Sequence, residues 1–404
     1  MQFFHVDTLD DASAIVRANF DLAALGYEEL PLELAVGRYS YADIVSSENL
    51  PDYNRSTVDG YAVYAPNTYG ASDSIPTLLN YKGKVSMGEV NDNELGLADT
   101  LYVPTGGAVP RGANAMVMIE HTERMSENIA IYRPATVGEN IIAIGDDVQA
   151  GEVILHKGER ITPLKAGLLA ALGISKVKIY NRIKVAIIST GDELVAVGDK
   201  TRVGEIRDTN TILTESLLGA SIFQVTSSKL LADDYELLYN EVHVASNEAD
   251  LVLISGGSSI GAKDYTEKVL ESLGTILVHG IAIKPGKPTI VANIQGKLAI
   301  GLPGHPMACA LVLKLLVIDN ICSLFEPNRT PFVYANTSIN FPSSAGRLTI
   351  QPVKLEYLPT NIVATPIFYK SGLVSSLATA DGYVLIPHEK EGLAKNASVK
   401  VYLL

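Results

Sequence analysis

The sequence is short of basic residues, and this shortage excludes a class of partners. The 404 residues include 32 Lys and Arg against 45 Asp and Glu, so the net charge is −13 at pH 7. Proteins that bind nucleic acid or anionic membranes generally present a basic surface. We therefore expect neither nucleic acid nor a membrane among the partners of this chain.

Long apolar runs are missing as well, and cysteine is scarce. The most apolar run, Ala308 to Ile318, contains Lys314 and is too short to span a bilayer. Cys309 and Cys322 lie in or beside one apolar helical pattern and lack the spacing of a metal site, so we expect reduced core thiols. The stretch MQFFHVDTLDD reaches acidic residues without a basic region, which predicts no secretory signal and favours a cytoplasmic enzyme.

The remaining composition is that of a folded, turn-rich protein with several domains. Hydrophobic residues make up 47% of the chain and charged residues 19%, with 33 Gly and 19 Pro. The length exceeds one hydrophobic core, so about two to four domains are expected. The patterns predict a mixed α/β linker domain, a β-rich insert domain, a central doubly wound parallel-sheet domain and a C-terminal β-barrel domain, at residues 1–46 with 138–180, 47–137, 181–326 and 327–404 respectively.

Periodicity supports this division. Short apolar runs between turns predict the β-rich insert, and two-fold alternation after residue 327 predicts the C-terminal β domain. Thr162 and Pro163 predict the start of a helix that Gly173 closes. Strands at 184–190, 221–228, 250–255, 275–283, 288–292 and 298–302 alternate with helices at 210–219, 233–247, 264–273 and 306–324. Alternation of this kind is typical of a doubly wound parallel sheet.

Two polar loops follow strands of the central domain, where open parallel sheets bind ligands. One contains Thr190, Gly191, Asp192 and Glu193, and the other is SGGSSIG, residues 255–261, directly before a helix. Glycine backbone N–H groups and serine hydroxyls at a helix N-terminus suit a phosphate or another oxyanion. The loop lacks the Gly-Lys-Ser/Thr ending of a Walker loop. A glycine-rich turn without a ligand is the alternative.

A basic turn lies in a stretch without acids. Ser272 to Ile318 contains no Asp or Glu, and IKPGKP places Lys284 and Lys287 three residues apart around a Pro-Gly turn. An apolar sheet interior would explain the missing acids but not paired lysines at a turn, so we interpret the turn as an anion site. The loop GLPGHP leads into the next helix and brings His305, which either contacts a ligand or is structural.

Several acids near these loops are candidates for Mg²⁺, which takes one or two carboxylates together with phosphate oxygens and water. They are Asp192, Glu193, Asp208, Asp233, Asp234 and Asp264. Each is alternatively a helix cap, and Asp208 before Thr209 and Asn210 has the typical pattern of one. The stretch LPDYNRSTVDGYAV, residues 50–63, adds a polar loop that delivers the Asp59 carboxylate to a strand.

These motifs, in this order, resemble the molybdopterin molybdenumtransferases, the family that includes the E domain of gephyrin. The resemblance covers essentially the whole chain. It rests on RSTVDGYAV, PTGGAVPRGANAMVMIEHTE, ISTGDEL, GEIRDTN, SGGSSIGAKDYT, AIKPGKP and GLPGHP, together with GRL at residues 346–348.

The resemblance implies an enzyme of molybdenum cofactor biosynthesis. Its substrates would be adenylylated molybdopterin and molybdate, with Mg²⁺ assisting hydrolysis of the adenylate and AMP leaving as molybdenum is inserted. It also implies a homodimer, formed through the linker domain, with the active site between the central domain of one subunit and the DGYAV domain of the other. Transient contact with other cofactor-biosynthesis proteins is a further implied partnership.

Carried over by motif, the resemblance assigns roles to single residues. Catalytic roles go to Asp59, Glu193 and Asp264, and metal binding goes to Asp59, Asp264 and one of Asp233 and Asp234, between which the motif does not decide. The substrate-binding residues would be Thr105, Glu120, Asp147, Thr190, Gly191, Ser255, Gly256, Gly257, Ser258, Lys284, Lys287, Pro303, His305 and Arg347.

Two positions depart from the family pattern, and three other functions stay open. Arg55 and His305 stand where many relatives have Asn, which bears on ligand contacts and on the choice between molybdate and tungstate. A molybdopterin adenylyltransferase would share only the central domain. A scaffold of the gephyrin type would bind a protein without needing molybdate, and a tungstate-preferring insertase would share every motif.

Overall fold

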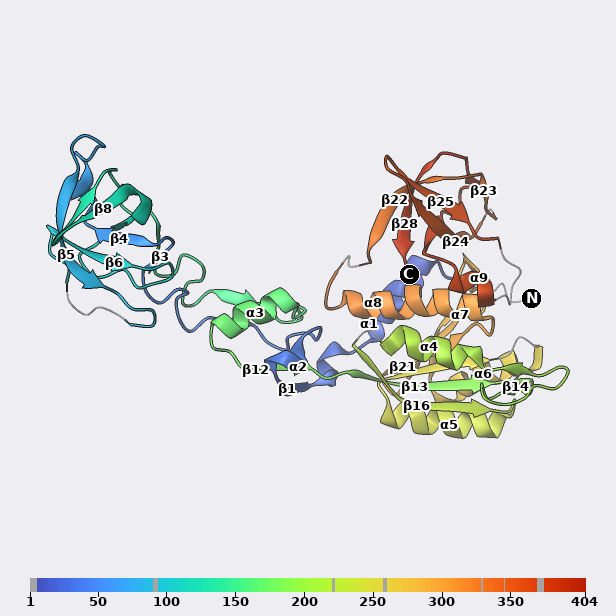
Figure 1. Cartoon of the computed structure of the whole chain (residues 1–404). Coiled ribbons are helices and arrows are strands. Elements are labelled where there is room, and N and C mark those ends of the chain that lie inside the picture. The colour runs from blue at the N-terminus through green and yellow to red at the C-terminus, as the bar shows by residue number, and fades with distance from the viewer. Residues whose placement is uncertain are drawn as a thin grey trace. The chain divides into compact units, whose positions relative to one another are not determined.

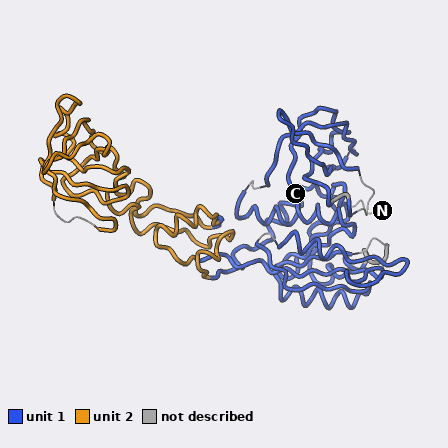
Figure 2. Tube along the Cα trace, in the orientation of Figure 1, with its two compact units in different colours: residues 1–28, 158–160, 178–404 blue, residues 29–157, 161–177 orange. Residues whose placement is uncertain are grey.

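The structure is a computed structural model that describes residues 6–89, 94–219, 222–256, 260–327, 330–344, 346–368 and 374–404, without the side chains of 260–264, 376 and 377. The chain forms two compact units (Figure 2). Unit 1 comprises residues 1–28, 158–160 and 178–404, and unit 2 comprises residues 29–157 and 161–177. The division into four domains stays a prediction.

Unit 1 is built around a six-stranded sheet (Figure 1). Across the sheet the strands are β16 (Phe223–Leu231), β13 (Ile183–Thr190), β17 (Leu251–Gly256), β21 (Lys297–Leu302), β20 (Ile290–Ile294) and β18 (Thr275–His279). The first four run parallel, which confirms the predicted fold class, whereas β20 is antiparallel to both of its neighbours. Only Gln295 and Gly296 join β20 to β21, both with positive φ. A two-residue hairpin permits an antiparallel pair only, because a parallel pair needs a long crossover.

Helices cover both faces of this sheet. Helices α5 (Tyr235–Glu248) and α6 (Ile260–Leu273) pack on one face against Ala186, Ile188, Val252 and Ile254. Helices α4 (Thr209–Gly219) and α7 (Pro306–Val312) lie over the other face (Figure 1). Because both faces are covered, β13 and β17 are buried almost throughout. This explains why their sequences read as continuous apolar runs.

The helix predicted at 306–324 continues through a π-helical segment. Helix α7 passes into η4 (Leu313–Ile318) and then into α8 (Asp319–Ser323). The Asn320 amide donates to the carbonyls of Leu315 and Leu316 and accepts from Arg17 of α1 (Leu9–Asn19). Within the described residues this is the one helix long and apolar enough to cross a membrane, but 67% of that stretch is buried inside the protein. It packs as a core helix.

Both cysteines lie on this long helix, as the sequence predicts. Neither is in a disulfide, with Cys309 buried and Cys322 partly buried. Burial raises the pKa of the Cys309 thiol to about 12. The thiol therefore stays protonated at neutral pH and is a poor nucleophile.

The C-terminal region closes into a five-stranded barrel, as predicted. Its strands are β24 (Leu348–Tyr357), β25 (Ile362–Pro366), β22 (Phe332–Thr337), β28 (Ser398–Leu403) and β26 (Gly382–Ile386), which pairs back with β24. A short strand before the lysine turn, β19 (Ile283–Lys284), adds to β24 in parallel. Backbone hydrogen bonds therefore tie the lysine turn to the start of the barrel.

Unit 2 contains a second six-stranded sheet. Its strands in order are β7 (Ala115–Met118), β4 (Gly60–Val63), β6 (Asp99–Val103), β5 (Thr77–Lys84), β9 (Asn128–Ile131) and β8 (Thr122–Met125). Strand β4 is wholly buried, with Tyr61 and Val63 in one apolar cluster and Ala62 in another. Helix α3 (Pro163–Ala171) begins and ends as predicted, because Thr162 accepts from the Lys165 N–H and Gly173 has a φ of +71°.

Candidate functional site

A pocket of about 590 Å³ lies at the carboxyl ends of the parallel strands of unit 1. Thr190 and Glu193 reach its wall from the end of β13, Ser255 and Gly256 from the end of β17, and His305 from the start of α7. Strand β13 is followed in the chain by β16, which pairs on one side of it, and then by β17, which pairs on the other side. Open α/β sheets bind ligands at such a switch point, so the pocket lies where the sequence predicts it.

A buried hydrogen-bond cluster includes Asp208 and Ser255 of the pocket wall and extends behind it. The Ser189 hydroxyl is 3.2 Å from Asp208 Oδ1, 2.9 Å from Thr211 Oγ1 and 2.9 Å from Ser255 Oγ. Asp208 also accepts from the Thr211 N–H at 3.1 Å and from its hydroxyl at 2.6 Å. Asp208 is therefore the helix cap that the sequence predicts, and it also anchors a polar cluster that sequence reasoning missed.

The structure separates the two acids that the sequence left undecided. Asp234 caps α5, where its Oδ1 accepts from the Leu237 N–H at 2.9 Å. Asp233 accepts a hydrogen bond from the hydroxyl of Thr190, which lines the pocket, and donates its own N–H to Asp192 at 3.0 Å. Asp233 is thus the acid that contacts the pocket wall, while its metal-binding role stays a prediction.

The lysine turn lies at the same edge of the sheet but outside the pocket wall. Lys284 and Lys287 are exposed, in the connection between β18 and β20. Gly286 between them has a φ of +118°, and a Cβ there would lie 2.6 Å from Val312 Cγ2, so the turn requires glycine. The Lys284 ammonium donates to Ser344 Oγ at 2.9 Å. Arg347 is exposed directly before β24, whose Leu348 and Thr349 pair with Ile283 and Lys284.

Unit 2 gathers three of the predicted residues at one end of its sheet. Asp59 directly precedes β4, whose first residue pairs with both Val103 and Met118. Thr105 and Glu120 follow the ends of those neighbouring strands, and both are exposed, as is Asp59. The Asp59 carboxylate accepts a hydrogen bond from the backbone N–H of Thr105 at 2.8 Å. The backbone carbonyl of Asp59 accepts one from the N–H of Ile119 at 3.0 Å. The polar loop thus fixes one carboxylate at the sheet end.

The glycine after Asp59 fixes this geometry, so Gly60→Ala is expected to destabilise the protein. A Cβ at residue 60 would lie 2.0 Å from the carbonyl oxygen of Val117, which is backbone and cannot rotate away. Overpacking of this kind costs roughly 1–3 kcal/mol or more. Urea denaturation would measure the loss. Gly70→Ala is the matched control in the same unit, because nothing lies within 4 Å of its added Cβ; equal stability of the two variants would contradict the steric account.

The other predicted residues lie in different places. Gly191 is buried after β13, and Pro303 is buried directly before Gly304, which lines the pocket. Asp147 is exposed, with its N–H bonded to the Leu50 carbonyl. Gly257 and Ser258 lie outside the described residues. Asp264 belongs to α6, but its side chain is outside the described part. Sequence reasoning named Asn210 only as part of a cap; it lines the pocket and donates to the Gly304 carbonyl at 2.9 Å.

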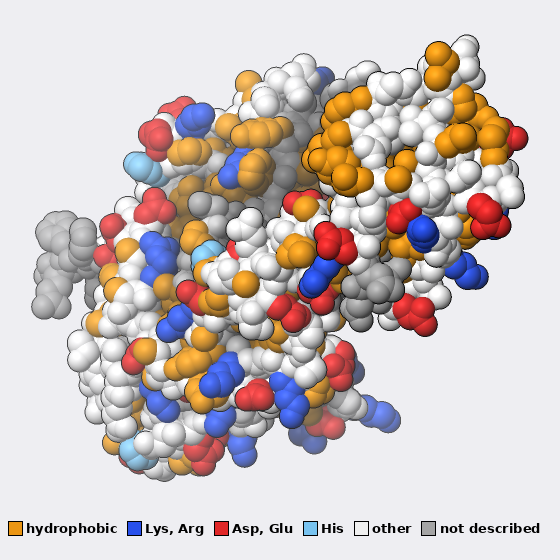
Figure 3. Space-filling model, turned by 90° about the vertical axis from the view of Figure 1, so that its left-hand side faces the viewer, with side chains coloured by type: hydrophobic (Ala, Val, Ile, Leu, Met, Phe, Trp, Pro, Cys, Tyr) orange, Lys and Arg blue, Asp and Glu red, His pale blue; other side chains and the backbone are white. Residues whose placement is uncertain are grey.

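The distribution of charged side chains bears on how a metal ion could be held. On the face shown in Figure 3, acidic and basic side chains are interspersed. Within the residues that the structure describes, no three His, Cys, Asp or Glu side chains gather to hold a metal ion. Mg²⁺ needs only one or two carboxylates when a substrate brings phosphate oxygens. The metal-binding roles of Asp59, Asp233 and Asp264 stay predictions.

Comparisons with known proteins give the same assignment along the chain. Family models match as the MoeA N-terminal region (domain I and II) at residues 8–173, the probable molybdopterin binding domain at 186–322 and the MoeA C-terminal region (domain IV) at 334–404. Molybdopterin molybdenumtransferase of Bacillus subtilis is 31% identical over 93% of this chain and 90% of its own. That of Haemophilus influenzae is 35% identical over 80% of each. A molybdopterin biosynthesis MoeA protein from Pyrococcus horikoshii superposes with a TM-score of 0.85, at 37% identity and 99% coverage of both chains.

Proposed function

Because this chain belongs to the molybdopterin molybdenumtransferase family, whose members are enzymes of molybdenum cofactor biosynthesis, we propose that it inserts molybdenum from molybdate into adenylylated molybdopterin in the cytoplasm. Water cleaves the phosphoanhydride and AMP leaves. Mo–S bonds form at the dithiolene while oxygen leaves molybdate as water, so molybdenum keeps its oxidation state. The reaction needs no cysteine nucleophile, which agrees with the protonated Cys309 thiol.

One observation carries the proposal: a switch-point pocket shares its sheet edge with an acid-free lysine turn. The pocket suits the pterin part of the substrate. Molybdate is a dianion, and the Lys284 and Lys287 ammonium groups suit it as charge-assisted donors. Arg347, next to the strand that pairs with Lys284, adds a third positive charge near the same turn. Substrate and oxyanion thus have separate sites on one edge.

The carboxylates have a different task from the lysines. Asp59 is held by the Thr105 N–H, so it can orient an attacking water or hold Mg²⁺ beside the phosphoanhydride. Glu193 in the pocket wall can accept a proton or a substrate N–H. Asp59 and Asp233 would hold Mg²⁺, with Asp264 assigned to it by the family motif alone. The ion would supply positive charge that neutralises the phosphate oxygens.

We also propose a homodimer in which Asp59 serves the pocket of the partner subunit. Apolar side chains stand exposed on the linker helices of unit 2, with Leu34 of α2 (Leu32–Ala35) 63% exposed and Leu164 of α3 88% exposed. Contiguous apolar patches mark interfaces between subunits, and these two helices contact each other. An isologous dimer would cover the same face of both chains.

Mixed dimers test this arrangement. Asp59→Asn and Glu193→Gln chains are each expected to be inactive alone. After equal mixing and subunit exchange, half of the dimers carry both chains and have one intact site, so about a quarter of the wild-type activity should return. Size-exclusion chromatography with light scattering would measure whether dimers form. A mixture that stays inactive although mixed dimers form would contradict sharing of the site between subunits.

The function itself is tested by active-cofactor formation. Purified protein receives adenylylated molybdopterin, Mg²⁺ and either molybdate or tungstate, and an apo-molybdoenzyme reports the cofactor formed. The proposal predicts activation that depends on added oxyanion, and the better oxyanion identifies the metal. A folded dimer that forms no cofactor with either oxyanion would contradict the proposal and favour a scaffold role.

A further inference from the structure

The buried cluster behind the pocket fixes the direction of its hydrogen bonds. A carboxylate only accepts, and a serine or threonine hydroxyl has one proton to donate. Asp208 accepts the Thr211 proton, and the Ser189 proton goes to Asp208 or to Thr211. In both cases Ser189 has no second proton to donate to Ser255. The hydrogen bond between Ser255 and Ser189 at 2.9 Å must then take its proton from Ser255.

The opposite direction is physically poor. If Ser189 donated to Ser255, its oxygen would face the Asp208 carboxylate at 3.2 Å with lone pairs only. Ser189 is fully buried and Asp208 is 6% exposed, so no bulk water would screen that repulsion. Asp208 would keep the two donors of Thr211 but would lose the Ser189 donor and face its lone pairs instead, and unmet hydrogen bonds in a buried site are costly.

The same accounting applies to the second hydroxyl of the pocket wall. Thr190 donates its only proton to Asp233. The hydroxyls of Thr190 and Ser255 both line the pocket, and each donates its proton to a group outside the wall. Each hydroxyl therefore offers a ligand only its lone pairs. Glu193 in the same wall also only accepts. This part of the pocket attracts N–H donors and repels phosphate or molybdate oxygens.

We propose that Ser189 is a positioning residue that, anchored by Asp208, holds the Ser255 hydroxyl as a hydrogen-bond acceptor for the N–H groups of the pterin. This rests on the proposed function and deepens it, because it divides the substrate between two sites. The donor-rich heterocycle belongs to the switch-point pocket, and anions belong to the lysine turn. It also revises the expectation that the Ser255 hydroxyl helps to bind an oxyanion.

The test measures the affinity of the full-length protein for unsubstituted pterin by calorimetry. Ser189→Ala frees the Ser255 proton without replacing a residue of the pocket wall, and Asp208 still accepts the Thr211 N–H that caps α4. We expect pterin to bind about fivefold more weakly or worse, because its N–H donors then compete with a hydroxyl proton that has lost its partner. Ser255→Ala should weaken pterin binding by at least as much. Binding of inorganic phosphate should not weaken in either variant, because the lysine turn is intact.

A double-mutant cycle separates positioning from a merely structural role. In the Ser255→Ala background, Ser189→Ala should change pterin affinity no further, because Ser189 acts through Ser255. Thr211→Val is the matched control: it removes a hydroxyl from the same cluster but not from the path to Ser255. It should leave pterin affinity unchanged, and thermal melting checks that all variants fold.

The outcomes are distinguishable. Additive losses in the cycle, or an unchanged affinity in Ser189→Ala, would overturn the positioning role while leaving the proposed reaction standing. Wild-type protein that binds no pterin would overturn the assignment of the heterocycle to this pocket. Loss of phosphate binding in Ser255→Ala would show that the hydroxyl donates to anions, which contradicts the inference directly.

Discussion

Asp59→Asn is expected to lower the rate of AMP release about 10²- to 10⁴-fold, the usual contribution of a positioned acid or base. Asparagine keeps the oxygen that accepts the Thr105 N–H, so the turn before β4 should survive. Only the negative charge is lost, and with it the ability to orient water as a base or to hold Mg²⁺. Single-turnover AMP release at saturating substrate would measure the change.

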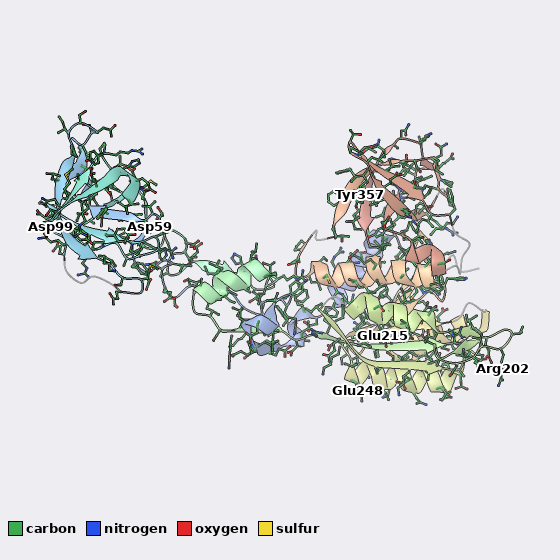
Figure 4. The ribbon with its side chains drawn as sticks, in the orientation of Figure 1. Asp59, Asp99, Arg202, Glu215, Glu248 and Tyr357 are labelled. Atoms are coloured by element: carbon green, nitrogen blue, oxygen red, sulfur yellow. The ribbon has the colours of Figure 1, made fainter. Side chains whose placement is uncertain are left out.

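A second aspartate of the same sheet provides the matched control. Asp99 begins β6, at the opposite end from Val103, which pairs beside Asp59 (Figure 4). It pairs with Lys82 at 3.5 Å and accepts from Asn80 at 3.0 Å. A surface pair of this kind contributes about 0–1 kcal/mol, so Asp99→Asn should turn over at the wild-type rate. Equal rates for Asp59→Asn and wild type would remove Asp59 from the chemistry.

Lys284→Met is expected to raise the dissociation constant for molybdate about 10- to 100-fold, the effect of a lost charge-assisted hydrogen bond. Methionine keeps most of the apolar stem and removes the ammonium group. The pterin affinity should not change, because Lys284 lies outside the pocket wall. Isothermal titration with molybdate, and separately with pterin, would measure both.

Two comparison variants isolate the charge at this turn. Lys354→Met removes an exposed lysine farther along β24 and should leave molybdate binding unchanged. Ser344→Ala keeps the ammonium of Lys284 but removes its hydrogen-bond partner. Its effect should be smaller than that of Lys284→Met. If Lys284→Met and Lys354→Met lost equal molybdate affinity, the lysine turn would contribute only through the net charge of the protein, which contradicts a specific anion site.

The sequence predicts most of the fold because its patterns are local. Apolar runs between Gly-rich loops predicted β13 and β17, and the Thr162–Pro163 pair predicted the start of α3. The reversal of β20 was missed because the hairpin at Gln295 and Gly296 carries no strong turn signal in its first residue. The π-helical segment was missed for a different reason. Hydrophobic periodicity predicts a helix but does not distinguish an α-helical turn from a single π-helical one. The side chain of Asn320, which donates to two carbonyls of the same helix, gives no such signal in the sequence.

The sequence predicted single residues of the candidate site better than it predicted which of them lie together. The motifs located Glu193, Ser255 and Lys284 at one edge of the sheet, but strand order decides which of them share a pocket. Only the structure separates Asp233, which contacts Thr190, from the cap Asp234. The role of Ser189 could not come from the sequence, because a serine inside an apolar strand carries no signal until its partners from two other segments are known.

AMP release from adenylylated molybdopterin, with and without molybdate, tests the central claim most directly. Wild-type protein with Mg²⁺ would be followed by chromatography for AMP and by metal analysis for molybdenum bound to the pterin. Insertion chemistry predicts AMP release that requires molybdate and equals the molybdenum incorporated, mole for mole. AMP release without molybdenum incorporation, or no release from a folded dimer, would contradict the assignment of this chain as a working insertase.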